Sequence, residues 1–276
     1  MTILSETAFA KINLALHVRK RRDDGYHELE TLFAFVDAGD HLTASASDEL
    51  ELSVSGPFAK GLGGQDDNLV LQTAKLLQRT FDVKTGAILT LEKNLPVASG
   101  IGGGSADAAA TARLLNRLWN LGASESELAT LLAPLGADIP ACVVSETAIG
   151  TGTGTELRVL DDEDLSGTPV LLVNPLLPVS TATIFRNWDG IDRGCLGVGD
   201  ALQVAQSGRN DLEPIAVDIC PAIAVILQAL EATSPMLSRM SGSGATCFAL
   251  YENVAAMRVA ASAMNPSWWT LEGRLR

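Results

Sequence analysis

Residues 95–110 constrain this chain most, because a cluster of glycines joins a strand pattern to a helix pattern there. Residues 87–91 predict a strand and residues 106–121 a helix, and four of the five residues 100–104 are glycine. Glycine permits positive φ angles and a close approach of the backbone to a ligand. Unpaired N–H groups and the helix dipole at a helix start favour an anion. The stretch predicts a phosphate-binding loop, with a plain glycine-rich turn as the alternative.

Charge restricts the partners of such a loop. The 276-residue chain carries a formal net charge of -13, which disfavours nucleic acid and anionic membrane surfaces as partners. It contains no run of 18 apolar residues that would predict a membrane span. We therefore expect neither a nucleic-acid nor a membrane partner, and a local pocket that holds the phosphate.

The N-terminus lacks the basic and long apolar segments of a secretory signal. No two cysteines form a CxxC pair, which favours reduced thiols in the cytoplasm, and the histidines lack metal-ligand spacing. The cysteines are Cys142, Cys195, Cys220 and Cys247.

Polar residues interrupt the apolar alternation near the N-terminus. Residues 8–18 predict a strand on which Lys11 and Asn13 share one face, either a solvated face or part of a site. The basic residues 19–22 belong to a predicted turn and are either solvated or a clamp for an anion. His27 follows this turn, where a histidine is usually exposed.

Hydrophobic periodicity and local start and stop signals predict the remaining elements. A capping-box pattern begins at Ser124, and Pro221 should divide a long apolar helix. The acidic run 161–164 suggests a domain boundary near residues 155–168. Helices are expected over residues 69–81, 106–121, 125–135, 214–232 and 255–264, and strands over residues 29–36, 87–92, 169–174 and 246–251, with a hairpin over 40–54.

Asp138 stands at a predicted helix start, two residues before Pro140. A carboxylate at this position is commonly an N-cap. One fixed between apolar neighbours is also well placed to act as a general base. Composition does not separate these two roles.

Several pieces, in this order, resemble the GHMP kinase superfamily and, within it, the 4-diphosphocytidyl-2-C-methyl-D-erythritol kinases. The glycine loop and the late Gly-Ser-Gly motif resemble the superfamily, and the other pieces resemble the narrower family. The pieces lie at residues 10–14 (Ala-Lys-Ile-Asn-Leu), 24–27 (Asp-Gly-Tyr-His), 67–69 (Asp-Asn-Leu), 95–105, 135–140 (Leu-Gly-Ala-Asp-Ile-Pro) and 241–244 (Ser-Gly-Ser-Gly).

The resemblance implies an α+β, two-domain GHMP kinase fold with the site in the cleft between the domains. It implies an N-terminal ribosomal protein S5 domain 2-like domain over residues 1–157 and a C-terminal ferredoxin-like domain over residues 158–276. The implied activity is ATP-dependent phosphorylation of the 2-hydroxyl of 4-diphosphocytidyl-2-C-methyl-D-erythritol, in the non-mevalonate isoprenoid pathway. ATP and Mg²⁺ are the implied cofactors, and the metal ligands are left open.

The resemblance also implies residue roles. Lys11 and Asp138 would be catalytic and flank the substrate hydroxyl. Two departures from the family pattern stand in the loop: Ile101, where Leu is more usual, and Ala106, which removes a hydroxyl. ATP phosphates would lie on Pro96, Val97, Ala98, Ser99, Gly100, Ile101, Gly102, Gly103, Gly104 and Ser105, and the adenine near Asn68 and Lys93. Substrate would contact Asn13, Tyr26, His27, Asp138, Gly242 and Gly244, with the cytosine held by Tyr26 and His27.

Two other functions are weighed against this kinase. A non-catalytic nucleotide- or sugar-binding relative would not need both Lys11 and Asp138. Another GHMP kinase, acting on homoserine, mevalonate or a sugar, would not need the aromatic pair at Tyr26 and His27 for a cytidine. We expect a cytoplasmic monomer or weak homodimer that acts on a small molecule.

Overall fold

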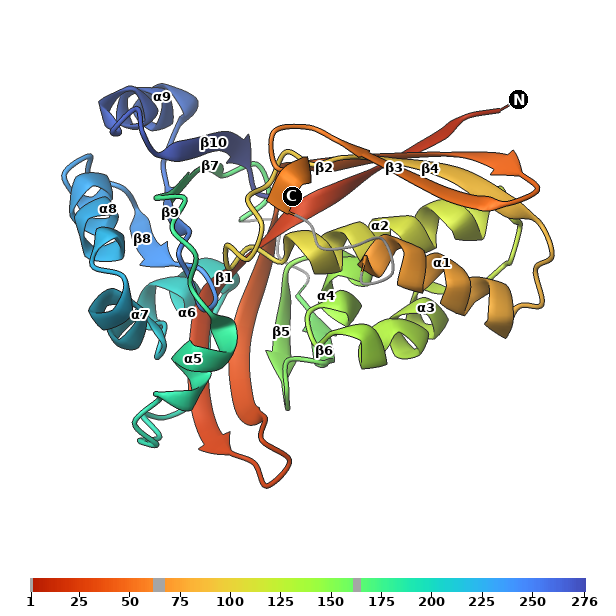
Figure 1. Cartoon of the computed structure of the whole chain (residues 1–276). Helices are drawn as coiled ribbons and strands as arrows, with labels where there is room; N and C mark the ends of the chain where they lie inside the picture. Colours follow the sequence, from red (N-terminus) through yellow and green to blue (C-terminus); the bar gives the residue numbers. More distant parts are fainter. Residues whose placement is uncertain (1, 62–67, 161–164) are drawn as a thin grey trace. The chain divides into compact units, whose positions relative to one another are not determined.

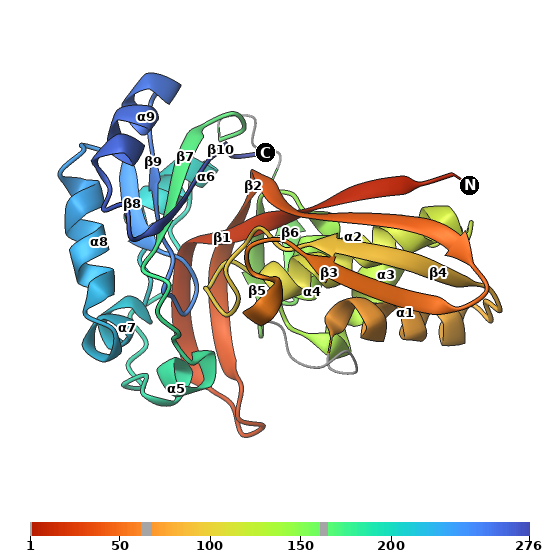
Figure 2. The same ribbon diagram turned by 45° about the horizontal axis from the view of Figure 1, so that its top comes forward.

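The computed structural model describes residues 2–61, 68–160 and 165–276, in which the chain forms two compact units (Figures 1 and 2). The acidic run 161–164 and Asp67 lie outside the described residues. The predicted domain boundary after residue 157 stays a prediction. Unit 1 comprises Met1–Ala10, Gly39–Val97 and Gly102–Ser145, and unit 2 comprises Lys11–Ala38, Ala98–Ile101 and Glu146–Arg276.

Strands and helices of both units make the fold α+β, as the sequence predicts. The strands are β1 (Leu4–Arg21), β2 (His27–Ser47), β3 (Leu50–Ser55), β4 (Gly86–Glu92), β5 (Ala148–Thr151), β6 (Glu156–Val159), β7 (Pro169–Asn174), β8 (Leu237–Met240), β9 (Cys247–Leu250) and β10 (Trp269–Arg274). The helices are α1 (Leu69–Thr80), α2 (Gly103–Leu118), α3 (Glu125–Leu132), α4 (Ile139–Val144), α5 (Thr181–Arg186), α6 (Ala201–Ser207), α7 (Glu213–Ile219), α8 (Ala222–Glu231) and α9 (Val254–Ala263), with short 3-10 helices η1 (Ala59–Gly61) and η3 (Ala133–Leu135).

Unit 1 is a sheet with helices on one face. The second half of β2 pairs antiparallel with β4, and β3 pairs parallel with β4. A parallel pair needs a crossover, which here contains α1. Helices α1 to α4 lie on the same side of β3 and β4 (Figure 1), and α2 packs between α1 and α4. The alanine-rich stretch of α2 that follows its first turn, residues 106–112, is buried.

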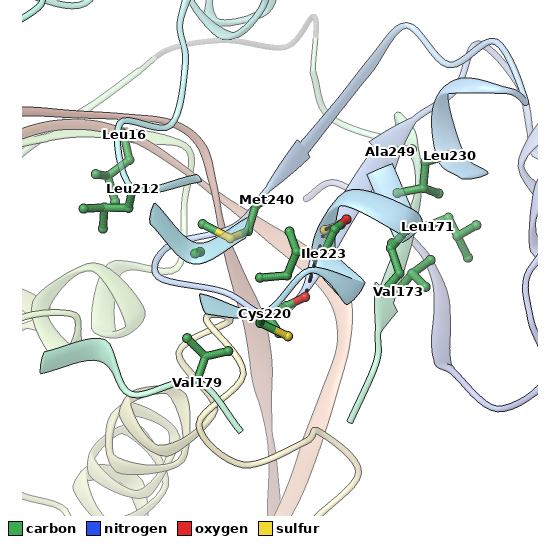
Figure 3. Close-up of a cluster of buried hydrophobic side chains, with 14 of the residues drawn as sticks. Leu16, Leu171, Val173, Val179, Leu212, Cys220, Ile223, Leu230, Met240 and Ala249 are labelled. Atoms are coloured by element: carbon green, nitrogen blue, oxygen red, sulfur yellow. Dashed lines mark hydrogen bonds between the residues drawn. The ribbon is translucent and has the colours of Figure 1, made fainter. Parts of the chain in front are cut away.

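Unit 2 contains a four-stranded antiparallel sheet in the order β10-β7-β9-β8. Helices α8 and α9 pack against it. The first half of β2 pairs with β5, and β5 pairs with β6. Figure 3 shows the apolar cluster of this unit, in which Ile223 of α8 and Met240 of β8 lie among side chains from β7 and β9. Burial of apolar surface of this kind is the main stabilising term of a domain.

Local signals place several element ends. The Ser124 hydroxyl accepts from the Glu127 N–H while the Glu127 carboxylate accepts from the Ser124 N–H, which is the predicted capping box. The apolar stretch 214–232 is divided into α7 and α8 around Pro221, as predicted.

Three expectations about elements were wrong. Strand β1 runs on through Arg21, so residues 19–21 are strand and not turn. Helix α2 begins at Gly103 rather than at Ala106, because glycines can occupy its first turn. Residues 40–54 are not a hairpin, because the end of β2 and β3 each pair with β4, which lies between them.

None of the described helices has the length and apolarity that a membrane crossing requires. All four cysteines are free thiols in the structure.

Candidate functional site

Lys11 and Asn13 are buried on β1, 3% and 2% exposed, which excludes the alternative of a solvated face. Residues 10–18 of β1 are buried on both faces of the strand. Lys11 Nζ donates to Asn13 Oδ1 at 2.9 Å and lies 5.3 Å from the centre of the Phe33 ring. Asn13 Nδ2 donates in turn to the Thr31 hydroxyl at 2.8 Å. An amide oxygen and an aromatic face orient an ammonium without cancelling its charge.

The glycine loop and the late Gly-Ser-Gly loop meet within unit 2. The Ser241 hydroxyl accepts from the Asn13 N–H at 3.1 Å and donates to the Gly100 carbonyl at 2.9 Å. Gly100 has φ +79°, and a Cβ there would lie 2.4 Å from the Ser241 carbonyl oxygen, so only glycine fits. The Thr246 N–H donates to the Ser99 carbonyl at 3.1 Å. The structure thus brings two predicted loops together beside Asn13.

Helix α2 begins in unit 1 at a glycine N-cap with a partly exposed first turn. Its N-cap, Gly102, is left-handed with φ 65°, and no side chain caps the helix start. Backbone N–H groups of the first turn are therefore not bonded by a capping side chain. A Cβ on Gly104 would meet Leu69 alone, at 3.4 Å. Uncapped N–H groups at a helix start suit a phosphate.

Lys93 and Asn68, the residues predicted beside adenine, have structural partners in unit 1. Lys93 is 1% exposed and its ammonium is held by the carboxylates of Asp40 and Asp107, the latter at 2.7 Å. Burial opposes the charge, but Asp107 and Asp40 outweigh it and raise the pKa of Lys93. The Asn68 side chain accepts from the Val70 N–H and so caps α1. Neither the ion pairs of Lys93 nor the capping bond of Asn68 was predicted from the sequence.

Asp138 occupies the N-cap position of α4 but its side chain makes no capping hydrogen bond to that helix. It is half-buried, and Pro140 stands in the first turn of α4. A half-buried carboxylate that does not cap its helix keeps the role of general base open.

His27 is 7% exposed, so the expectation of an exposed histidine was wrong. Its ring lies 5.1 Å from that of Phe185 and 5.7 Å, edge to face, from that of Trp188. Arg21 Nε donates to His27 Nε2 at 3.4 Å, which places the ring proton on Nδ1. Burial, and then the charge of Arg21, lower the pKa of His27. Tyr26, in contrast, is 61% exposed.

The three arginines among the basic residues 19–22 contact groups of unit 2 itself. Arg19 pairs with Glu30 and with Asp192, the latter at 2.9 Å. Arg21 donates to the carbonyls of Arg186 and Trp188, each at 3.2 Å. These side chains fasten the segment after α5 to β1.

Residues that the sequence did not single out complete these arrangements. Phe33, Phe185 and Trp188 supply ring faces, and Asp40 and Asp107 supply carboxylates. Their aromatic or acidic character was the only signal for them in the sequence. Asp40 and Asp107 lie 53 and 14 residues from Lys93 along the chain, so no local pattern reveals their contacts with it. Among the described residues, no group of three or more His, Cys, Asp or Glu side chains could hold a metal ion.

The chain matches the models of two protein-family domains. Residues 68–146 match the model of the GHMP kinases N terminal domain, and residues 197–268 match that of the GHMP kinases C terminal domain. Together they cover more than half of the chain. The first match contains α1, the glycine loop and Asp138, and the second contains the Gly-Ser-Gly loop.

Curated relatives of high sequence identity show to which family of GHMP kinases the chain belongs. The chain is 55% identical to a 4-diphosphocytidyl-2-C-methyl-D-erythritol kinase of Novosphingobium aromaticivorans, over 99% of this chain and 93% of the relative. It is 52% identical to the protein of that name in Erythrobacter litoralis, over 99% and 100%. The chain is a GHMP kinase of the 4-diphosphocytidyl-2-C-methyl-D-erythritol kinase family.

This kinase also matches a solved structure over its whole length. A crystal structure titled 4-(cytidine 5'-diphospho)-2C-methyl-D-erythritol kinase is 31% identical with a TM-score of 0.84, and 99% of each chain is covered. The predicted family and the predicted two-domain GHMP kinase fold are therefore confirmed. The chain is a small-molecule kinase.

Proposed function

We propose that this kinase transfers a phosphoryl group from ATP to the 2-hydroxyl of 4-diphosphocytidyl-2-C-methyl-D-erythritol, in the non-mevalonate route to isoprenoid precursors. The observation that carries the proposal is full-length similarity, at 50–55% identity, to three proteins of that name. The solved homoserine and mevalonate kinases that the chain resembles over its full length are only 16% and 13% identical, which shows the fold alone.

ATP fits the described residues of the glycine loop. The start of α2, whose N-cap Gly102 is left-handed and has no side chain to cap the helix, supplies backbone N–H donors. We propose that the phosphates lie along Pro96 to Ser105 and that the adenine lies near Asn68 and the backbone and alkyl chain of Lys93, whose ammonium is engaged by carboxylates. ATP supplies the phosphoryl group, and the chain's own residues hold and orient it.

The acceptor hydroxyl would be handled by Asp138 and Lys11. Asp138 accepts the hydroxyl proton as general base, which fits a carboxylate that does not cap its helix. Lys11, oriented by Asn13 and Phe33, stabilises the negative charge of the attacking oxygen. Asn13 supports Lys11 and contacts substrate, and Gly242 and Gly244 contribute backbone contacts.

The cytosine would be held by Tyr26 and His27. The exposed Tyr26 ring offers a stacking surface. His27 is kept neutral by burial and by Arg21, with its proton on Nδ1 as a donor for an acceptor atom of the base. A neutral imidazole with a fixed tautomer reads a base by hydrogen bonding rather than by charge.

We further propose that Mg²⁺ accompanies ATP, held by phosphate oxygens and water, which this ion prefers as ligands. The enzyme is proposed to act in the cytoplasm as a monomer or weak homodimer. The free thiols agree with a reducing compartment.

An assay that couples ADP release to NADH oxidation tests the substrate. Purified protein is given Mg-ATP with the cytidyl substrate, mevalonate or homoserine in parallel. We expect turnover with the cytidyl substrate alone. Turnover with mevalonate or homoserine, and none with the cytidyl compound, contradicts the assignment.

The variant Asp138→Asn tests the base. It keeps the shape of the side chain but removes the proton acceptor, so turnover should fall by about 10²–10⁴ while binding of an ATP analogue stays within about twofold of the parent's. A rate near that of the parent protein means that Asp138 is not the base.

A further inference from the structure

A buried cluster of three charged side chains lies at the glycine loop in unit 1. Asp40, Lys93 and Asp107 are 0%, 1% and 3% exposed. Lys93 Nζ donates to Oδ2 of both carboxylates. Oδ1 of Asp107 is buried and has no hydrogen-bond partner among the described residues. An unsatisfied buried polar atom is costly, so this oxygen calls for an explanation.

The cluster contacts the residue just before the glycine loop and the first residue of the helix that follows it. Asp40 Oδ1 accepts from the Leu95 N–H at 2.8 Å, just before the loop. A Cβ on Gly103 would lie 3.1 Å from Lys93 Nζ and 3.8 Å from Asp40 Oδ2. The ammonium therefore lies against the first residue of α2, and Asp107 itself projects from the second turn of that helix. Small changes in the cluster will move the backbone that the phosphates would contact.

The net charge of the cluster has the wrong sign for this position. Two carboxylates and one ammonium leave one negative charge beneath a loop that binds an anion. Burial, and then the negative charge of Asp40, raise the pKa of Asp107 to about 7 against the opposing effect of Lys93. The buried residues of the neighbouring helices α1 and α4 are all uncharged, so Lys93 and Asp40 are the charged groups that act on Asp107.

We infer that Asp107 is a positioning residue of the nucleotide site, and that it takes up one proton from solvent as the triphosphate binds. The proton forms an O–H bond at Asp107 and removes the negative charge beneath the loop, while Asp40 and Lys93 stay paired. The inference rests on the proposed nucleotide site. Protonation of Asp107 also explains why its Oδ1 can be buried without a hydrogen-bond partner, since a neutral carboxyl group costs less free energy to bury than a carboxylate.

The coupling of proton uptake to nucleotide binding sets the size of the expected pH dependence of affinity. If one proton is taken up, affinity falls about tenfold for each pH unit above the pKa of Asp107 in the free protein. The Asp107→Asn variant carries no titrating group at this position. Its affinity for a nucleotide should therefore be nearly the same at pH 7 and pH 8, after the nucleotide's own titration is subtracted.

Titration calorimetry with the magnesium complex of a non-hydrolysable ATP analogue tests the inference. Each variant is measured at pH 6 and pH 8 in two buffers of different ionisation enthalpy, which gives the number of protons taken up. Wild type should take up close to one more proton at pH 8 than Asp107→Asn, and the difference should nearly vanish at pH 6. The control Asp82→Asn removes the same charge from an exposed side chain of unit 1 and should behave as wild type.

Steady-state kinetics gives a second readout. Asp107→Asn should lower the KM for ATP at pH 8 by about tenfold relative to wild type with little change in kcat, which a merely structural role would not produce. If Asp107→Asn fails to fold, judged by its circular dichroism, Asp107→Ser takes its place.

Equal proton uptake by wild type and the folded Asp107 variant, with the analogue bound by both, overturns this inference and leaves the nucleotide site standing. No binding of the analogue by wild type overturns the nucleotide site and the inference together.

Discussion

Two buried lysines, Lys11 in unit 2 and Lys93 in unit 1, are held by different kinds of partner. Lys11 is contacted by the Asn13 amide oxygen and the Phe33 ring, which are neutral. Lys93 is contacted by two carboxylates. Asn13 and Phe33 orient the Lys11 ammonium, whereas the two carboxylates hold the Lys93 ammonium in a buried ionic cluster. We therefore propose that Lys11 acts on the substrate and that Lys93 supports the glycine loop.

The largest expected effect on stability comes from Lys93→Met. Removing the ammonium leaves two carboxylates buried without their cation, so the free energy of unfolding should fall by about 3–5 kcal/mol. Urea denaturation followed by circular dichroism measures it.

The double variant Lys93→Met with Asp107→Leu is the matched control. It removes one of the two stranded carboxylates, while Asp40 keeps its backbone donors. More than half of the lost stability should return. No recovery would mean that Lys93 acts through packing alone.

Asn13→Ala should produce a smaller effect, and mainly on rate. It removes the acceptor of Lys11, so the ammonium is no longer oriented and kcat should fall about tenfold, as expected for one charge-assisted hydrogen bond. Asn116→Ala is the control, because Asn116 bonds only the backbone of Ala123 after α2. Its kcat should match that of wild type; equal losses in both variants contradict a special role for Asn13.

The elements that were predicted correctly from the sequence are those set by residues close together along the chain. The Ser124 capping box, the division at Pro221 and α1 all follow from local rules. The glycine loop and the family also followed from motifs. Helix α2 was placed three residues late, because glycine is a poor helix former in general but tolerable in a first turn.

Burial of polar residues could not be predicted. Lys11 and Asn13 alternate with apolar residues as solvent-facing residues do, and only the three-dimensional structure shows that they are buried. His27 follows a turn yet packs between Phe185 and Trp188, which are more than 150 residues away in the sequence. Lys93 was assigned to adenine, because no local pattern reveals Asp40 and Asp107 around it.

A pH dependence of stability is expected at the Lys93 cluster. The pKa of Asp107 is raised to about 7 in the folded protein and is about 3.9 in an unfolded chain. The folded state therefore binds the proton more tightly, and the stabilisation it gives is lost as pH rises from about 4 through 7. Relative to Asp107→Asn, wild type should lose unfolding free energy across this window. Urea denaturation at several pH values measures the difference, and parallel curves contradict the raised pKa.

The most direct test of the contrast between the two lysines is the single-turnover rate of phosphoryl transfer in Lys11→Met, with the cytidyl substrate and Mg-ATP both saturating. The account predicts a rate lower by at least about 100-fold, with the affinity for an ATP analogue within about twofold of that of wild type. A rate near that of wild type would contradict the account, because Lys11 would then be a buried structural lysine like Lys93.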